Sequence, residues 1–431
     1  MRRRLLLPLL LSACAPAVTS TTPVPPPTPA APIPSAAEAP APAAPAAAPA
    51  SFLAWKDDFI RRAVAKGFDR AFLERELGGL TPNDRIVSLD RKQPEFSKPI
   101  GSYVQTAVSS DRVAEGVRRR DTSAWAGPIE QRYGVPIEIL IGIWAQESAF
   151  GKVQGDFDVV RAFATLAWDG RRRDWAEGQL LDALTIIRDH GVPRSRLTGS
   201  WAGAMGQTQF IPENYLKLAQ DFDGDGRPNI WTSDADALAS AANLLATAGW
   251  RPGESWAVEV SLPAGFDYSV AESDKLTPSE WGARGVKRAD GSYWTAKDQA
   301  AQATLLLPAG AQGPAFLLFP NHFVIRKYNN SVAYALAIGQ LADRMQGKPG
   351  LSRAWPAEQP LSKDDRYAAQ QALAQLGYDP GGVDGVIGAG TRSALRAWQK
   401  SNGLIADGYL TAELVGRLRA QAALPAAGAP Q

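Results

Sequence analysis

An almost continuous apolar stretch near residues 135–150 carries a single inward carboxylate, and this stretch constrains the fold more than any other segment. It opens at Val135-Pro136, and large apolar side chains then recur at helical spacing, at Ile137, Leu140, Ile141 and Trp144. Such a helix belongs inside a core, and Glu147 shares its inward face. Burial raises the pKa of a carboxyl group, so Glu147 would suit general acid catalysis at a glycosidic oxygen. A glutamate that only caps or pairs near a helix end is the alternative.

A second segment, residues 199–212, places glycines and amides between two helical patterns. It reads G-S-W-A-G-A-M-G-Q-T-Q-F-I-P. Glycine lets the backbone approach a polymeric ligand closely. Glutamine side chains can hydrogen-bond sugar hydroxyls and N-acetyl groups. The segment therefore favours a carbohydrate-binding surface.

An acidic loop begins at Asp221 with the letters D-F-D-G-D-G. Oxygen ligands at positions one, three and five, with glycine at six, match the start of an EF-hand calcium loop. The end departs from that pattern, because position twelve is Thr232 and the nearest carboxylates are Asp234 and Asp236. An acidic turn whose aspartates cap the next helix is the alternative. Zinc is not suggested, since His190 and His322 are far apart in sequence.

Three motifs in this order, E-S-x-F-G at 147–151, G-A-M-G-x-x-Q-F-x-P at 203–212 and D-F-D-G-D-G at 221–226, resemble the lytic murein transglycosylase B family. This family is similar to glycoside hydrolase family 103, and the resemblance extends over residues 52–345, including Q-P-E-F-S-K-P ahead of Tyr103. It implies an α+β, predominantly helical fold with a lysozyme-like catalytic core and a small β-containing subdomain. It also implies cleavage of the bond between N-acetylmuramic acid and N-acetylglucosamine, with 1,6-anhydro ends as product and Glu147 as the acid.

The resemblance assigns further site residues by position. Substrate contacts would come from Ser148, Arg172, Arg173, Met205, Gln207, Gln209, Phe210, Tyr328, Asn329 and Tyr334. A structural calcium ion would be held by Asp221, Asp223, Asp225, Asp236 and the backbone carbonyl of Arg227. No cofactor is implied for catalysis. Judged without the resemblance, adjacent arginines are more often a solvated surface, and Tyr328-Asn329 would be a core tyrosine and a turn asparagine.

Two other function classes stay open at this point. Asp156 and Asp158 are near Glu147 in sequence and would serve a lysozyme-like muramidase, a hydrolase with two carboxylates. A non-catalytic lipoprotein that only holds peptidoglycan is the third interpretation.

The amino terminus predicts export and a lipid anchor. Met1-Arg-Arg-Arg is followed by a leucine-rich stretch too short to span a bilayer, which is typical of a signal peptide over residues 1–13. Leu-Ser-Ala-Cys at 11–14 resembles a bacterial lipobox, so Cys14, the only cysteine, would be lipidated. Ala15 resembles the outer-membrane sorting pattern, and we expect a periplasmic protein anchored to that membrane. An ordinary signal with an incidental cysteine is the alternative.

Composition divides the rest of the chain. Residues 14–50 are rich in proline and alanine and predict an extended tether. A catalytic region over 51–345, a linker over 346–360 and a tail over 422–431 enclose a further compact unit at 361–421. Helical patterns are expected near 52–65, 68–77, 110–119 and 176–187, and strands near 256–262, 304–307, 316–319 and 323–325.

The unit at 361–421 resembles the peptidoglycan-binding domain type 1. It holds L-G-Y at 376–378, D-G-V-I-G at 384–388, T-R-S-A at 391–394, W-Q at 398–399 and D-G at 407–408. The pattern predicts a small three-helix wall-binding domain, in which Asp384 and Thr391 fix turns as readily as they touch ligand.

Net charge gives no sign of a nucleic-acid partner, because it is only +2 over 431 residues. The expected partners are peptidoglycan glycan strands and, through the lipid anchor, a membrane. Protein partners cannot be named from the sequence.

Overall fold

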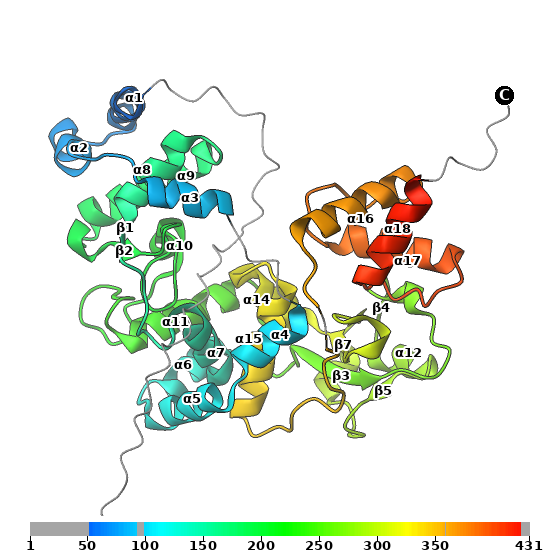
Figure 1. Ribbon diagram of the computed structural model, residues 1–431. Helices are drawn as coiled ribbons and strands as arrows, with labels where there is room; N and C mark the ends of the chain where they lie inside the picture. Colours follow the sequence, from blue (N-terminus) through cyan, green and yellow to red (C-terminus); the bar gives the residue numbers. More distant parts are fainter. Residues whose placement is uncertain (1–50, 93–98, 358, 424–431) are drawn as a thin grey trace, which may run out of the picture. The chain divides into compact units, whose positions relative to one another are not determined.

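The computed structural model describes residues 51–92, 99–357 and 359–423 (Figure 1). The signal peptide, Cys14, the tether and most of the Q-P-E-F-S-K-P segment, predicted from the sequence, lie outside the described residues. No helix within the described ranges is both long and apolar enough to cross a membrane.

Helices build most of residues 52–345, as predicted. Their bounds are α1 Phe52–Ala65, α2 Arg70–Leu77, α3 Asp84–Lys92, α4 Ile100–Ala107, α5 Ser110–Thr122, α6 Ala126–Tyr133, α7 Ile137–Ser148, α8 Val159–Asp169, α9 Arg173–Asp189, α10 Pro212–Leu218, α11 Asp234–Thr247, α12 Pro278–Ala283, α13 Ala296–Ala300, α14 Pro320–Tyr328 and α15 Val332–Met345. A two-stranded ribbon pairs β1 (Phe157–Asp158) with β2 (Thr198–Gly199) in antiparallel register.

Helix α7 lies in the main hydrophobic core and is buried along almost its whole length. It packs against α5, α6, α11 and α15. Pro136 precedes its first turn, and the Glu130 side chain accepts a hydrogen bond from the Ile137 backbone N–H. The start of the helix is thus fixed by Pro136 and Glu130, which are close to it in sequence, and its sides are held by the neighbouring helices.

A five-stranded antiparallel sheet forms the small β-containing subdomain. Its strands are β3 Ala257–Ser261, β4 Lys275–Leu276, β5 Lys287–Arg288, β6 Ala303–Leu306 and β7 Ala315–Leu318, in the order β4-β6-β7-β3-β5. Leu317 of β7 is paired with Val258 on one side and Leu305 on the other. This sheet has its own buried cluster around Trp281 and Phe319.

The sequence prediction of a strand at residues 323–325 is wrong. These residues lie in α14, which begins at Pro320 directly after the strand β7 and Phe319. Proline fits the first helical turn. A run of only three apolar residues, two of them β-branched, is too short to favour a strand over a helix that begins in this way.

Three helices form the carboxyl-terminal bundle, as predicted: α16 Lys363–Gln375, α17 Ala389–Ser401 and α18 Ala412–Ala423. Leu373, Leu395 and Trp398 are buried in its core. The buried amide of Gln370 donates to Asp384 Oδ1 and to Thr391 Oγ1, both at 3.1 Å. Asp384 and Thr391 therefore fix the turn between α16 and α17.

Candidate active site

Glu147 stands in the last turn of α7, with only 7% of its surface exposed. The Tyr334 hydroxyl, from α15, donates to Glu147 Oε1 at 2.6 Å. Burial raises the pKa of Glu147 to about 8, while the hydrogen bond from Tyr334 opposes that rise. The group is therefore protonated at neutral pH and available as an acid.

Three tyrosines from three helices surround this carboxyl group electrostatically: Tyr103 of α4, Tyr328 of α14 and Tyr334. Burial raises the pKa of each phenol, and the nearby Glu147 charge raises it further. The Tyr103 hydroxyl accepts a hydrogen bond from the Gln146 amide at 2.9 Å. Tyr103 was not among the predicted site residues, although it follows the Q-P-E-F-S-K-P segment that the family resemblance includes.

The chain leaves α7 through three consecutive residues with positive φ: Ala149 at 50°, Phe150 at 61° and Gly151 at 81°. Non-glycine residues adopt this conformation rarely, and such strain gathers at functional sites. Ser148 holds the turn, because its Oγ accepts from the Gly151 N–H at 2.8 Å and donates to the Gln207 carbonyl at 2.5 Å. Ser148 is buried and serves as a link between two segments.

The glycine-rich segment folds back on itself beside this exit. Met205 forms β-bridges with Gly199 and with Phe210, and the side chains of Met205 and Phe210, both predicted to contact substrate, are buried. Gln209 takes a positive φ of 52°, and its amide donates to the carbonyls of Gln154 and Gly206. The Tyr328 hydroxyl donates to the Thr208 carbonyl, which ties this segment to α14.

Gln207 is buried, and both the oxygen and the nitrogen of its side-chain amide are hydrogen-bonded. Its Oε1 accepts from the Trp144 indole at 2.9 Å, and its Nε2 donates to Asp234 Oδ1 at 3.0 Å. A Cβ at Gly151 would collide with Gln207 Oε1, so glycine is required where α7 meets this segment. These contacts join Gln207 to α7 and to the start of α11.

Three buried oxygens of this group have no hydrogen-bond partner among the described residues: Thr208 Oγ1, Gln209 Oε1 and Asn329 Oδ1. Leaving a buried polar group unpaired costs about 1–3 kcal/mol, so such groups mark places where a ligand or water completes the bonding. They come from the two segments that the Tyr328–Thr208 bond joins. A ligand rich in hydroxyl and amide groups would satisfy them.

The two predicted arginines make their contacts with other elements. Arg172 donates to Asp90 Oδ1 at 2.7 Å, and its guanidinium lies over the Trp175 ring. Arg173, the first residue of α9, donates to the Ala167 carbonyl. Asp90 is itself buried, so these charges brace α3, α8 and α9.

Asp158, a candidate for the second carboxylate of a two-carboxylate hydrolase, already has hydrogen-bond and ion-pair partners within the fold. Asp158 caps α8 by accepting from the Arg161 N–H, and it forms an ion pair with Arg194 at 2.5 Å. Asp156 is exposed.

The acidic loop gathers four carboxylates. Ligand oxygens of Asp221, Asp223, Asp225 and Asp236 all lie within 4.8 Å of one another. Oxygens bound to one calcium ion at 2.3–2.6 Å lie at most about 5 Å apart, so the set has suitable dimensions. The cap of α11 is Ser233, whose Oγ accepts from the Asp236 N–H, so the helix does not need an aspartate for capping. The backbone N–H of Arg227 donates to Asp225.

Comparison with known proteins decides the family. A family model of the Transglycosylase SLT domain matches residues 51–343. The chain belongs to this family. The membrane-bound lytic murein transglycosylase B of Escherichia coli K12 is 34% identical over 310 residues, which cover 66% of this chain and 80% of that relative. The family resemblance inferred from the sequence motifs is confirmed.

Solved structures of lytic transglycosylases are similar to this chain in sequence and in fold. SltB3 from Pseudomonas aeruginosa, in complex with NAG-NAM-pentapeptide, is 47% identical, covers 86% of this chain and 100% of that chain, and has a TM-score of 0.82. The Escherichia coli lytic transglycosylase Slt35, in complex with calcium, is 32% identical, covers 68% of this chain and 92% of that chain, and has a TM-score of 0.58. Residues 362–418 of this SLT-domain protein also match a peptidoglycan binding domain.

Proposed function

We propose that this protein is a lytic transglycosylase that cleaves the bond between N-acetylmuramic acid and N-acetylglucosamine in peptidoglycan and leaves 1,6-anhydro ends. The observation that carries the proposal is the buried Glu147, whose carboxyl group has a pKa raised to about 8 by burial. Family membership, the similar transglycosylases and the matched peptidoglycan binding domain support the same substrate.

One acid is sufficient for this reaction. Glu147 gives its proton to the glycosidic oxygen as the bond to the muramic acid C1 breaks, and the substrate's own acetamido group stabilises C1. The Glu147 carboxylate then takes the proton of the C6 hydroxyl as that oxygen bonds to C1. The acid is regenerated, no water is consumed, and the product is the anhydro sugar. A hydrolase would need a carboxylate to activate water, and Asp158 is committed to Arg194 and to the α8 cap.

Mass spectrometry of digested sacculi tests the proposal. Purified protein without residues 1–50 should release fragments with anhydro ends, whereas fragments with reducing ends would mean hydrolysis and no release would mean a binder. Glu147→Gln keeps the shape but removes the titrating proton. It should lower the rate by about 10²–10⁴ or more while sacculus binding is retained.

We further propose that the acidic loop holds a structural calcium ion through Asp221, Asp223, Asp225, Asp236 and the Arg227 carbonyl. The four clustered carboxylates support this, as does the calcium complex of Slt35. Calcium is a hard ion that prefers oxygen ligands, and here it would hold the loop against the start of α11.

Calcium should therefore raise the melting temperature of this protein. A ligand that binds only the folded state adds RT ln(1 + [L]/Kd), which is about 2.7 kcal/mol at one hundred times Kd. The double variant Asp223→Ala, Asp225→Ala should lose the calcium dependence, whereas Asp57→Ala on the exposed face of α1 should keep it. Melting curves that coincide in calcium and in chelator would contradict the proposal.

The remaining chain order is also proposed: a signal peptide at 1–13, lipidation at Cys14, a tether to residue 50, the catalytic region at 51–345, a linker at 346–360, the wall-binding domain at 361–421 and a tail at 422–431. The lipobox-like residues and the proline-rich composition support a tethered outer-membrane lipoprotein of the periplasm.

A further inference from the structure

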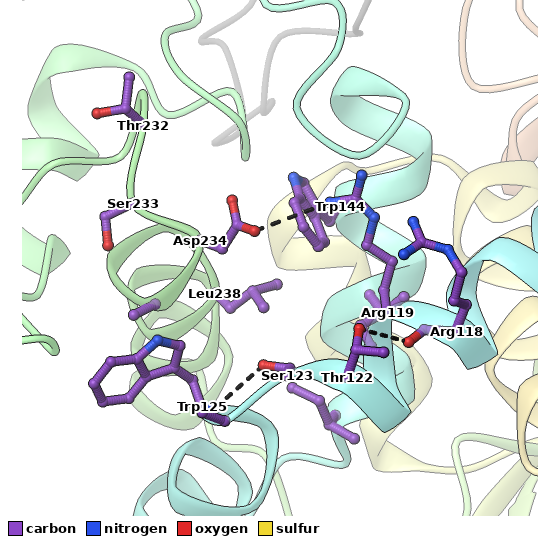
Figure 2. A pocket seen from close by; sticks show the side chains of 14 residues that line it. Arg118, Arg119, Thr122, Ser123, Trp125, Trp144, Thr232, Ser233, Asp234 and Leu238 are labelled. Atoms are coloured by element: carbon purple, nitrogen blue, oxygen red, sulfur yellow. Dashed lines mark hydrogen bonds and ion pairs between the residues drawn. The ribbon is translucent and has the colours of Figure 1, made fainter.

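A cavity of about 670 Å³ lies between the end of α5, the turn leading to α6, the part of α7 from Ile137 to Trp144, and the start of α11. Figure 2 shows Asp234 reaching from the α11 side toward Arg119 and Trp144 on the opposite wall. Cavities of this size commonly hold small ligands. Glu147 is not among the residues that line it, although Trp144 stands one turn earlier on the same helix.

The charges at this cavity balance. Arg118 and Arg119 both bond to Glu115, at 2.7 Å and 2.9 Å. Arg119 also lies 3.9 Å from the carboxylate of Asp234. Two guanidinium groups are thus paired with two carboxylates, of which only Asp234 lines the cavity, and these ion pairs leave little charge for a strongly ionic ligand.

The rest of the lining is amphipathic. Ile137, Ile141 and Leu238 supply an aliphatic wall, and Trp125 keeps 37% of its surface exposed at the rim. Hydroxyl groups stand around them, from Thr122, Ser123, Thr232 and Ser233. A neutral sugar is likewise divided into apolar and polar parts. Its C–H faces pack on aromatic rings, and its hydroxyl groups form hydrogen bonds at the edge of the ring.

We propose that this cavity is an accessory saccharide site, which binds a neutral N-acetylated sugar unit of a glycan strand outside the catalytic centre. The proposal rests on the proposed cleavage of peptidoglycan and adds a second point of attachment on the catalytic region. Trp125 supplies the aromatic face, while Asp234 and Arg119 supply an acceptor and a donor. A second attachment raises the effective concentration of a polymer at the catalytic groove without changing the chemistry.

The site can be read out through the Trp125 indole N–H resonance in the full chain carrying Glu147→Gln, which prevents turnover. The resonance is assigned by its loss in Trp125→Ala. Titration with N,N′-diacetylchitobiose should shift it in a saturable way, whereas inorganic phosphate and D-alanyl-D-alanine should not. A shift by either ionic probe without one by chitobiose, or no shift by any of them, would overturn the proposal.

Kinetics on sacculi give a second, independent readout. Trp125→Ala should raise KM about tenfold, the loss expected for one aromatic contact. Thr232→Arg, an exposed substitution that narrows the opening, should raise it as well, so the result does not depend on the folding of one variant. Tyr293→Ala removes a side chain that is 95% exposed in the β-containing subdomain and should leave KM unchanged.

The outcomes separate this site from the function. Wild-type protein that releases no anhydro fragments would refute the proposed function. Wild-type release together with an unchanged KM in both cavity variants would refute the accessory site alone.

Discussion

At the scale of single residues, the chemistry depends on two opposed influences on Glu147. Burial makes the neutral acid the stable form, and the Tyr334 hydroxyl stabilises the ionised form that must exist between the two proton transfers. The acid thus remains protonated before the reaction, yet its conjugate base is not left without a partner.

Replacing Tyr334 with phenylalanine should move the pH profile in a defined direction. Loss of the hydrogen bond leaves burial unopposed, so the pKa of Glu147 rises above about 8. The protonated form is the active one and is lost as pH rises through the pKa. The descending limb of kcat/KM should therefore shift to higher pH, by roughly one unit for one hydrogen bond to a charged group.

Tyr133→Phe is the matched control for this profile. Its hydroxyl donates to Gln220 at 3.1 Å and makes no contact with Glu147, so the limb should stay in place. A limb that moves to lower pH in Tyr334→Phe would contradict the assigned role of the hydrogen bond.

The sequence was informative about Glu147 because helical spacing alone sets its face among Leu140 and Trp144. Residue spacing was not informative about the groups that surround Glu147, and Tyr328 and Tyr334 were assigned to the site only by the family resemblance. Tyr103, Tyr328 and Tyr334 come from three different helices, and only tertiary packing brings them to one carboxyl group. The substrate contacts predicted for Arg172 and Gln207 stay predictions, since the hydrogen bonds of both side chains join elements of the fold.

At the scale of elements, the end of α7 and the glycine-rich segment form one interlocked unit. Ser148 joins them through the Gln207 carbonyl, and Gln207 returns a bond to Trp144 of the same helix. The unit fixes both the acid and the unpaired oxygens beside it.

Gly151→Ala should disrupt this unit. The residue has a φ of 81°, and a Cβ there would meet the Gln207 side chain. We expect a loss of about 2 kcal/mol or more in the free energy of unfolding, together with lower activity. Urea denaturation and sacculus digestion measure the two effects.

Gly127→Ala provides the comparison, because Gly127 lies in α6 and an added Cβ meets nothing within 4 Å. Alanine favours a helix over glycine by up to about 1 kcal/mol, so this variant should be as stable as wild type or more so. Equal destabilisation by both substitutions would show that the close contact between Gly151 and Gln207 does not contribute specifically to stability.

Element types were largely predictable because the apolar periods are long in the helices and because Val258 and Val260 alternate with polar residues in β3. Strands β6 and β7 show no such alternation and are buried at every position, as short apolar runs inside a sheet are. The segment 323–325 shows the limit. Three apolar residues fit either period, and the helix is decided by Pro320 and by packing of α14 against α15.

At the scale of the whole molecule, the proposed anchor and the wall-binding bundle would hold the enzyme between a membrane and its polymer. Cys14→Ala should abolish membrane attachment, because each buried CH₂ of an acyl chain contributes about 0.8 kcal/mol to membrane binding. Fractionation of cells should find this variant soluble in the periplasm, with activity retained, whereas Ser20→Ala should stay with the outer membrane. A membrane-bound Cys14→Ala protein would place the anchor elsewhere.

The bundle formed by α16, α17 and α18 has a hydrophobic cluster distinct from that of the catalytic region. Each cluster can lose its order by itself, so heating should not give a single all-or-none transition. Because the enthalpy of unfolding scales with the number of residues, the bundle should contribute the smaller and broader calorimetric peak. A substitution near Glu147 would then displace only the larger peak, and the smaller one would serve as a reference within the same sample.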